Sequence, residues 1–421
     1  MSEWKEYKLG DITDWFSGGT PSKDKKEFWG GDIPWISAKT MTDYKVSSSE
    51  LNVTKAGLLN GSRLANEKDI LLLVRGSGLF NDIPINIVEK PVAFNQDIKA
   101  IRAKNPQLQD YIFFWLQGNK KGLNDILEET GIGAGKFDTD LLKKLEISIP
   151  SSESEFNFII DTAKTIFDKI DLLHRQNATL EKMAETLFRQ WFVEPIKKIT
   201  NEGAEVDDFS NANFGKWIKE TVGGEWGKEN PEGDFNKVVY CIRGTDIADL
   251  NIGLPTKTPI RFVKETKFKN IEPLEGDLII EISGGTESQS TGRVCYVNQD
   301  IKNLFKYPLV FSNFCRMIRV KKAEYSFFLY CYIQYLYNQD EFFNLENGSS
   351  GIKNLDYKAL LFELEYPMPN ENLVIDFHNQ VAPFFKKVNQ NKIQIRTLST
   401  LRDTLLPKLM SGESTVELEH E

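Results

Sequence analysis

Hydrophobic side chains recur at alternating spacings of three and four residues over a long stretch in the first half of the chain. The series is Phe156, Ile159, Ala163, Ile166, Ile170, Leu173, Asn177, Leu180, Ala184, Leu187 and Trp191. This heptad pattern predicts one long helix over residues 151–194. Asn177 interrupts the apolar positions, and a polar residue there can fix the register of a helix pair at a cost in stability.

A second series of the same kind lies near the end of the chain and predicts a helix over residues 370–412. It runs through Val381, Phe384, Val388, Asn391, Ile395, Leu398, Arg402, Leu405 and Leu409. We expect Pro383 to kink or delay the start of this helix, and Pro407 with Gly412 to end it. Such long helices favour antiparallel coiled-coil pairing with each other. The alternative is that they are core helices of a globular bundle.

The remaining segments mix short apolar runs with Gly, Pro, Asn and Asp turns, as in residues 32–37. This pattern predicts two mainly β domains with a few helices, over residues 1–150 and 216–369. The polar, acidic stretch 195–215 is expected to be a linker, and residues 413–421 a tail. The fold class is therefore α+β, with two mixed domains joined by two long antiparallel helices.

The two β-rich domains are copies of one module. Residues 4–10 answer to 217–223, and the strand-like run 69–72 answers to 277–280. Each run leads into a glycine loop, and each copy has a second glycine loop further on. The loops are 75–78 and 131–136 in the first copy, and 283–286 and 348–353 in the second. Because these matches keep one order, the chain carries the sequence domain, helix, domain, helix.

Composition and charge narrow the function. The chain has 421 residues and a net charge of -9, and the stretches 1–150, 151–194, 195–215, 216–369 and 370–421 each have a net negative charge. DNA binding would therefore depend on local patches or on partners. No apolar run is long enough to span a membrane. Four cysteines without a C-x-x-C pair indicate free thiols in a reducing cytoplasm, and the three histidines are too few for a His-rich metal site.

No catalytic motif stands out. Residues 131–136 resemble a phosphate-binding loop but are one residue short, and Phe137 stands where the hydroxyl should follow Lys136. Asp277 with Glu281 suggests a metal nuclease, but Ser283 stands where a lysine should follow. We therefore expect a protein without catalysis or a cofactor of its own.

Particular strings resemble the specificity subunits of type I restriction-modification systems. These strings are residues 18–22 leading to 29–36, then 187–193 at the end of the first helix and 405–413 at the end of the second. The likeness covers nearly the whole chain, although residues 223–227 depart from the Gly-Thr-Pro-Ser pattern of the first copy.

The resemblance implies a sequence-specific DNA-binding subunit. Each domain would read one half of a bipartite target in double-stranded DNA, and the helices would set the spacer and dock adenine-N6 methyltransferase subunits. S-adenosylmethionine would come with those partners, and ATP and magnesium with a motor–nuclease restriction subunit. The helix positions expected in the seam or in docking are Ile166, Ile170, Leu173, Asn177, Leu180, Leu187, Trp191, Val388, Ile395, Leu398 and Leu405.

Candidate DNA contacts come from the glycine loops and neighbouring strings. They are Thr20, Ser22, Lys39, Arg75, Ser77 and Lys136 in the first domain, and Arg243, Arg293, Lys353 and Asn354 in the second. Each charged one could instead be an ordinary solvated residue, and Thr20 and Ser22 could be turn or cap residues. Trp35 is expected in the core rather than as a base-stacking platform. Two other functions stay open: an assembly scaffold that reads no DNA, and an enzyme with an unrecognised motif.

Overall fold

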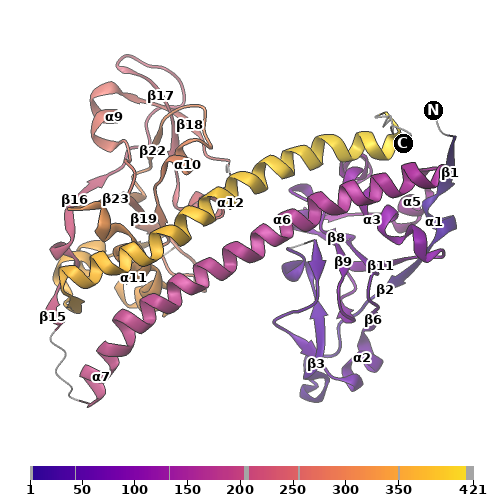
Figure 1. Ribbon diagram of the computed structural model, residues 1–421, viewed down its shortest axis with the longest axis horizontal. Coiled ribbons are helices and arrows are strands. Elements are labelled where there is room, and N and C mark those ends of the chain that lie inside the picture. The colour runs from indigo at the N-terminus through magenta and orange to yellow at the C-terminus, as the bar shows by residue number, and fades with distance from the viewer. Residues whose placement is uncertain are drawn as a thin grey trace. The chain divides into compact units, whose positions relative to one another are not determined.

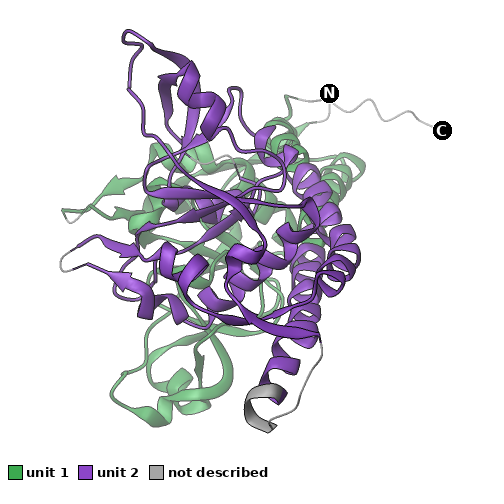
Figure 2. Ribbon diagram, turned by 90° about the vertical axis from the view of Figure 1, so that its left-hand side faces the viewer, with its two compact units in different colours: residues 1–172, 397–421 green, residues 173–396 purple. Residues whose placement is uncertain are grey.

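The computed structural model describes residues 3–42, 44–131, 133–202, 208–254, 257–348 and 351–413. The chain forms two compact units (Figures 1 and 2). Unit 1 comprises residues 1–172 and 397–421, and unit 2 comprises residues 173–396. Each unit therefore combines one β-rich domain with parts of both long helices, and this α+β architecture confirms the predicted fold class.

Unit 1 contains three larger sheet assemblies and one closing strand pair. The five-stranded sheet has the order β2 (Thr13–Ser17), β11 (Ile98–Ala103), β7 (Ile70–Leu73), β9 (Ile85–Val88), β4 (Lys45–Val46). The four-stranded sheet has the order β5 (Asn52–Val53), β3 (Trp29–Ile36), β10 (Val92–Phe94), β6 (Arg63–Ala65). A small sheet joins β12 (Glu128–Glu129), β13 (Gly135–Lys136) and β8 (Arg75–Gly76), while β1 (Trp4–Lys8) pairs with β14 (Glu146–Pro150).

Short helices complete the first domain: α1 (Leu9–Ile12), α2 (Lys55–Gly61), α3 (Gln109–Gly118), α4 (Lys120–Asp125) and α5 (Thr139–Lys144). Helix α3 is apolar on nearly every side, and its buried residues 111–116 lie in the core. Phe167 of α6 (Glu153–Phe188) and Leu406 of α12 (Glu371–Ser411) belong to the same core cluster. The ends of the two long helices are thus part of this unit's hydrophobic core.

Unit 2 repeats the arrangement. Its four-stranded sheet has the order β16 (Ile218–Gly223), β23 (Cys315–Val320), β19 (Leu278–Glu281), β21 (Val294–Tyr296). A three-stranded sheet has the order β18 (Ile260–Lys264), β17 (Phe235–Ile242), β22 (Leu309–Phe311). The small sheet has the order β20 (Ser283–Gly284), β25 (Lys353–Leu355), β24 (Glu346–Asn347). Its short helices are α8 (Ile247–Asn251), α9 (Glu265–Ile271), α10 (Gln299–Lys302) and α11 (Ser326–Asn338). Helix α11 is the counterpart of α3, and its buried side packs against Phe188 of α6 and Phe377 of α12.

One glycine in each copy of the module is required because it packs closely against a backbone carbonyl group. A Cβ on Gly18 would lie 2.2 Å from the carbonyl oxygen of Phe94, and a Cβ on Gly224 would lie 2.2 Å from that of Phe311. Only glycine allows the chain to approach so closely. The second copy therefore departs from the Thr-Pro-Ser string while keeping the residue on which this packing depends.

The two long helices run antiparallel within each unit. In unit 2, Phe188 of α6 contacts Phe377 of α12, and Asn177 contacts Asn391. In unit 1, the Arg402 guanidinium of α12 lies 5.4 Å from the ring centre of Phe167 on α6. Residue numbers rise along one helix as they fall along the other, which is antiparallel pairing.

The predicted seam differs in detail from the buried positions. Ile170, Leu173, Asn177, Val388 and Ile395 are buried, whereas Ile166, Leu180, Leu187, Trp191, Leu398 and Leu405 are only half-buried. Phe167, Phe188 and Phe192 are more deeply buried than the seam residues beside them. A straight α-helix drifts relative to a seven-residue repeat. In addition, α6 packs on a domain core as well as on α12, so its buried side is broader than one seam.

Pro383 does not delay the start of the second long helix, and Pro407 does not end it. Helix α12 begins at Glu371 and ends at Ser411, so it continues through both Pro383 and Pro407. Both prolines lie on the exposed side, where water can bind the carbonyl groups that a proline leaves unbonded. Gly412 does end the helix, with a positive φ of 73° that is typical of a C-terminal cap.

The stretch predicted as a linker, 195–215, is structured at both ends. After α6, a π-helical turn (Arg189–Val193) leads into α7 (Glu194–Glu202), and β15 (Phe209–Ala212) pairs with β26 (Tyr366–Pro369). Residues 203–207, and all of the predicted tail except Glu413, lie outside the described residues. The acidic composition of residues 195–215 favoured a linker, so helix α7 and strand β15 were not predicted from the sequence.

All four cysteines are free thiols, as the sequence predicted; Cys241, Cys295 and Cys315 are buried and Cys331 is partly exposed. Among the described residues, no helix combines the length and apolarity that a bilayer-spanning segment needs.

Candidate nucleic-acid interface

The two glycine loops of the first copy meet on one small sheet. Lys136 of β13 lies directly opposite Arg75 of β8, and Glu128 of β12 lies opposite Lys136 on its other side. Gly135 permits this approach, because a Cβ there would lie 2.9 Å from the Cβ of Leu79. The structure therefore joins two cationic candidates that are some sixty positions apart in the sequence.

The side chains of Arg75 and Lys136 are exposed and form no ion pair with the described residues. Ser77 is exposed in the 3-10 turn Ser77–Phe80 that follows β8. Phe80 of the same turn is 50% exposed, an aromatic face that the sequence analysis did not single out. Two unpaired cations, a hydroxyl and an exposed ring form a set of groups suited to phosphates and bases.

The other candidates of unit 1 lie on different elements. The hydroxyl of Thr20 donates to Oε1 of Gln96 at 2.7 Å, and the carbonyl of Ser22 accepts from the indole of Trp29 at 3.1 Å. Lys39 is exposed in the short turn Ala38–Thr40. Trp35 is 7% exposed and its indole donates to the carbonyl of Gly19, which confirms the expectation that it belongs to the core.

Unit 2 has a matching small sheet, with Lys353 opposite Gly284 and Asn354 opposite Ser283. Its polar groups are more engaged than those of unit 1. The ammonium of Lys353 lies 2.8 Å from Oε2 of Glu346, and the hydroxyl of Ser283 donates to Oδ1 of Asn354 at 2.7 Å. The hydrogen bond from Lys353 helps to hold the pKa of Glu346 below its usual value despite the opposing effect of burial.

Two arginines predicted as DNA contacts form ion pairs with buried carboxylates of unit 2. Arg293 donates from Nη2 and Nε to Glu281 at 2.7 and 3.0 Å, and Glu281 is only 1% exposed. Arg243 donates in the same forked way to buried Asp246 and also to the carbonyl of Lys257. Hydrogen bonding to these carboxylates raises the pKa of both guanidinium groups. Arg293 stays a predicted DNA contact, and in this structure its guanidinium is engaged with Glu281.

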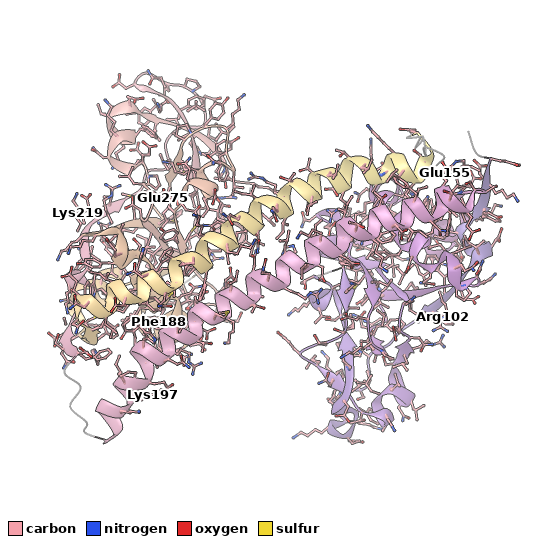
Figure 3. The ribbon with its side chains drawn as sticks, in the orientation of Figure 1. Arg102, Glu155, Phe188, Lys197, Lys219 and Glu275 are labelled. Carbon is pink, nitrogen blue, oxygen red and sulfur yellow. The ribbon has the colours of Figure 1, made fainter. Side chains whose placement is uncertain are left out.

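The same contacts account for the carboxylates that suggested a metal nuclease. Glu281 is engaged by Arg293, and Asp277 accepts from Nη2 of Arg319 at 2.8 Å. Asp69 of unit 1 holds Arg102 of β11 in the corresponding way, with both distances 2.8 Å. Figure 3 marks the position of Arg102. The duplicated pair is a structural element of the repeated module.

A basic and aromatic surface of unit 2 was missed from the sequence. The Arg261 guanidinium lies 4.3 Å from the ring centre of Trp226, and the Lys264 ammonium lies 5.1 Å from that of Phe235. Tyr240 stacks on Tyr307 at 5.9 Å. A signal was available: residues 257–269 contain five Lys or Arg and one Glu. The net charge of the whole domain, which the sequence analysis used, is a sum that does not show the local excess of basic residues.

The paired helices of unit 2 carry an apolar groove. It is lined by Ala178, Thr179, Lys182, Met183, Thr186 and Leu187 of α6 and by Gln380 and Phe384 of α12. Met183 is 45% exposed there. An exposed apolar groove on a helix pair is typical of a surface that binds another protein.

Comparisons with known proteins agree with this architecture. Residues 1–182 match the family described as type I restriction modification DNA specificity domain. The MjaIX specificity subunit of Methanocaldococcus jannaschii is 27% identical over 445 residues, which cover 99% of this chain and 94% of that protein. The EcoR124I/EcoR124II specificity subunit of Escherichia coli is 34% identical over 173 residues, 41% of each chain.

Solved structures include the same fold. The S subunit of a type I restriction-modification system from M. genitalium superposes with a TM-score of 0.56 at 15% identity, covering 97% of this chain and 96% of that one. The family matched over residues 1–182 is one of DNA specificity domains. The resemblance found in the sequence, to the specificity subunits of type I restriction-modification systems, is confirmed by this match and by a relative of that name that aligns with nearly the whole chain.

Proposed function

We propose that each unit reads one half of a bipartite target in double-stranded DNA. The observation that carries this proposal is the duplicated small sheet, on which the two glycine loops of each copy meet. In unit 1 it presents Arg75, Ser77 and Lys136, and in unit 2 Lys353 and Asn354. Different side chains on equivalent strands suit two different half-sequences, because base edges are distinguished by the donors and acceptors that meet them.

The two long helices would set the unread spacer and dock the adenine-N6 methyltransferase subunits. Both α6 and α12 contribute residues to each unit, so the same two helices carry both recognition domains. The groove beside Met183 and Phe384 is the docking surface that we propose. The methyltransferase would then bind S-adenosylmethionine as its methyl donor, and a motor–nuclease subunit would bind ATP and magnesium. This chain would contribute no catalysis.

The experiment is methylation of random-sequence duplexes by this chain with its cognate methyltransferase, read out by sequencing the methylated adenines. A split motif with a fixed spacer is expected. Exchanging residues 1–150 for those of a related subunit should change one half of the motif and leave the other half unchanged. Methylation without sequence preference would contradict direct reading.

The second candidate is an assembly scaffold that reads no DNA. It is favoured by the net charge of -9 and by the engagement of Arg243 and Arg293 in internal ion pairs. A scaffold should bind the methyltransferase equally well with and without DNA. Any affinity of a scaffold for DNA should depend little on salt concentration. The affinity of a protein that contacts phosphates should fall steeply as salt is raised.

A further inference from the structure

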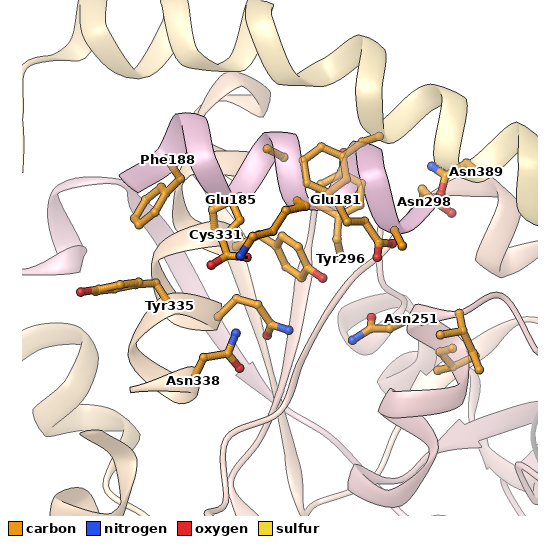
Figure 4. A pocket seen from close by; sticks show the side chains of 18 of the residues that line it. Glu181, Glu185, Phe188, Asn251, Tyr296, Asn298, Cys331, Tyr335, Asn338 and Asn389 are labelled. Carbon is orange, nitrogen blue, oxygen red and sulfur yellow. The ribbon is translucent and has the colours of Figure 1, made fainter. Parts of the chain in front are cut away.

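A cavity of about 450 Å³ lies within unit 2, among α6, α8, α11 and α12 (Figure 4). This volume is within the range of small-molecule sites, which is about 300–1,000 Å³. The cavity lies away from the small sheet proposed to read DNA, since none of Lys353, Asn354 or Ser283 lines it. Neither DNA reading nor helix docking accounts for it.

Aromatic rings form the walls of the cavity and are held by their neighbours. Tyr330 of α11 meets Phe385 of α12 edge to face, with ring centres 5.9 Å apart. Tyr296 stacks on Phe327 at 4.7 Å and also meets Tyr330 at 6.4 Å. Rigid ring faces of this kind suit a flat ligand, because stacking requires no rearrangement of the wall.

Polar groups without partners face the same space. The hydroxyls of Tyr296, Tyr330 and Tyr335 and the amides of Gln334, Asn338 and Asn389 form no hydrogen bond with other described residues. Gln334 and Asn338 are four positions apart on α11, so they lie on one side of that helix. In contrast, the amide of Asn251 is engaged with the carbonyl of Val294, and that of Asn298 caps α10.

The charges of the lining nearly balance. Lys182, Arg189 and Lys392 stand against Glu181 and Glu185. Lys392 is 18% exposed; its ammonium donates to the carbonyl of Asn251 and lies 3.9 Å from Oε1 of Glu181. Each of the three cations lies within 4.0 Å of one of the two carboxylates, so none is left free to bind a polyphosphate. The unpaired amides disfavour a purely hydrocarbon ligand, which would leave them without partners.

We propose that this cavity binds a purine nucleoside or a closely related flat nitrogen heterocycle. The heterocycle stacks against the ring of Tyr296, and the ring of Tyr330, which lies at 71° to that of Tyr296, meets it edge to face. The amides of Gln334 and Asn338 pair with the nitrogens and exocyclic groups of its edge, as Asn and Gln do with adenine. Glu181 accepts hydrogen bonds from the ribose hydroxyls, a common role for a carboxylate beside a nucleoside.

The test is calorimetric titration of the full chain, without DNA or partners, with adenosine, guanosine and cytidine. At least one purine nucleoside should bind, and cytidine should bind more weakly because its single ring covers less of the wall. Gln334→Leu should weaken purine binding at least tenfold, since it removes the amide while keeping helix propensity and size. Gln390→Leu, on the exposed side of α12 and outside the cavity, is the matched control.

Cys331 locates the bound ligand independently. It lines the cavity and is the one cysteine that is not buried. Burial raises the pKa of the Cys331 thiol to about 12, so its alkylation is slow in the free chain, and a bound nucleoside should slow it further, at least tenfold. The buried Cys241, Cys295 and Cys315 report that the fold is intact. Two results would overturn the proposal: no heat of binding with either purine nucleoside, or binding that is unchanged in Gln334→Leu. Both readouts are independent of DNA, so they do not depend on the proposed function.

Discussion

The side-chain amide of Asn391 donates a hydrogen bond to Oδ1 of Asn177, 2.8 Å away, between the two long helices of unit 2. Asn391 is 0% exposed and Asn177 is 8% exposed, and Asn391 also donates to Oε1 of Gln176 at 2.9 Å. Each helix thus carries its polar seam residue opposite that of the other. A slip of either helix would bury both amides without partners, which is how a polar pair fixes register.

Replacing one asparagine should therefore cost more than replacing both. Asn391→Leu leaves Asn177 unpaired in an apolar seam, and we expect a loss of about 1–3 kcal/mol in the free energy of unfolding. The double variant Asn177→Leu, Asn391→Leu should recover most of that loss but lose the preference for one register. Urea unfolding measures the first effect as a change in free energy and the second as a change in the slope of free energy against urea. Equal losses that add in the double variant would contradict the paired role.

The duplicated ion pair gives a second prediction. Asp69 is 2% exposed and accepts from Arg102 and from the backbone N–H of Asn66. Arg102→Met should lower the free energy of unfolding by about 3 kcal/mol, because it leaves the buried carboxylate without its counter-charge. The double variant Arg102→Met, Asp69→Asn should recover much of the loss in urea unfolding.

Arg63→Met is the control for the change at Arg102. Both guanidinium groups lie over the ring of Phe16, at 5.5 Å for Arg63 and 5.1 Å for Arg102. The control thus removes a cation–ring contact without exposing a buried carboxylate. If it proved as destabilising as Arg102→Met, the ring contact rather than the ion pair would be the cause.

The sequence predicted these features where the residues involved lie close together along the chain, and failed to predict them where the residues lie far apart along the chain. The repeat placed Asp69 with Asp277, because residues 69–72 match 277–280, and the structure shows that Arg102 and Arg319 bind these two carboxylates in the same way. The pairing of Arg75 with Lys136 is different: no local pattern shows that two glycine loops some sixty residues apart share a sheet. Likewise, the charge of Arg293 was visible, but its burial against Glu281 depends on the fold of β19 and the loop before β21.

Acidification should weaken the fold through His378. Burial lowers the pKa of this imidazole, against a smaller opposite effect of Glu324, and its ring stacks on Phe327 at 5.2 Å. Because the unfolded chain takes up the proton more readily, stability falls as pH drops below about 6.5, the usual pKa of histidine. Each unit of pKa lowering costs about 1.4 kcal/mol once the pH is below both pKa values.

His378→Phe should therefore lose less stability than the original chain between pH 7.5 and pH 5.5, as followed by thermal unfolding. His174, exposed on α6, supplies the control His174→Gln. A pH dependence that is the same in all three proteins would show that His378 titrates alike in the folded and unfolded chain.

The small sheet of unit 1 predicts a change in salt dependence. Lys136→Ala should weaken binding of the assembled complex to any duplex and lower the slope of log affinity against log salt by about 1, the loss of one phosphate contact. Arg75→Ala, Lys136→Ala should lower it further. Fluorescence anisotropy at several salt concentrations measures both, with Lys5→Ala, an exposed residue of β1, as control. An unchanged slope would remove this sheet from the DNA interface.

The groove on the helix pair predicts a separate loss of docking. Met183→Asp puts a charge into an apolar groove without touching the core, since Met183 is 45% exposed. Affinity for the methyltransferase should fall at least tenfold, about 1.4 kcal/mol, while the unfolding temperature stays within a degree or two. Leu59→Asp, at a residue of α2 that is 85% exposed, is the matched control and should leave affinity unchanged. Because the groove and the small sheets share no residues, Met183→Asp should reduce methylation by the mixture without altering the motif that is methylated. A changed motif would instead mean that α6 and α12 transmit docking to the DNA-reading domains.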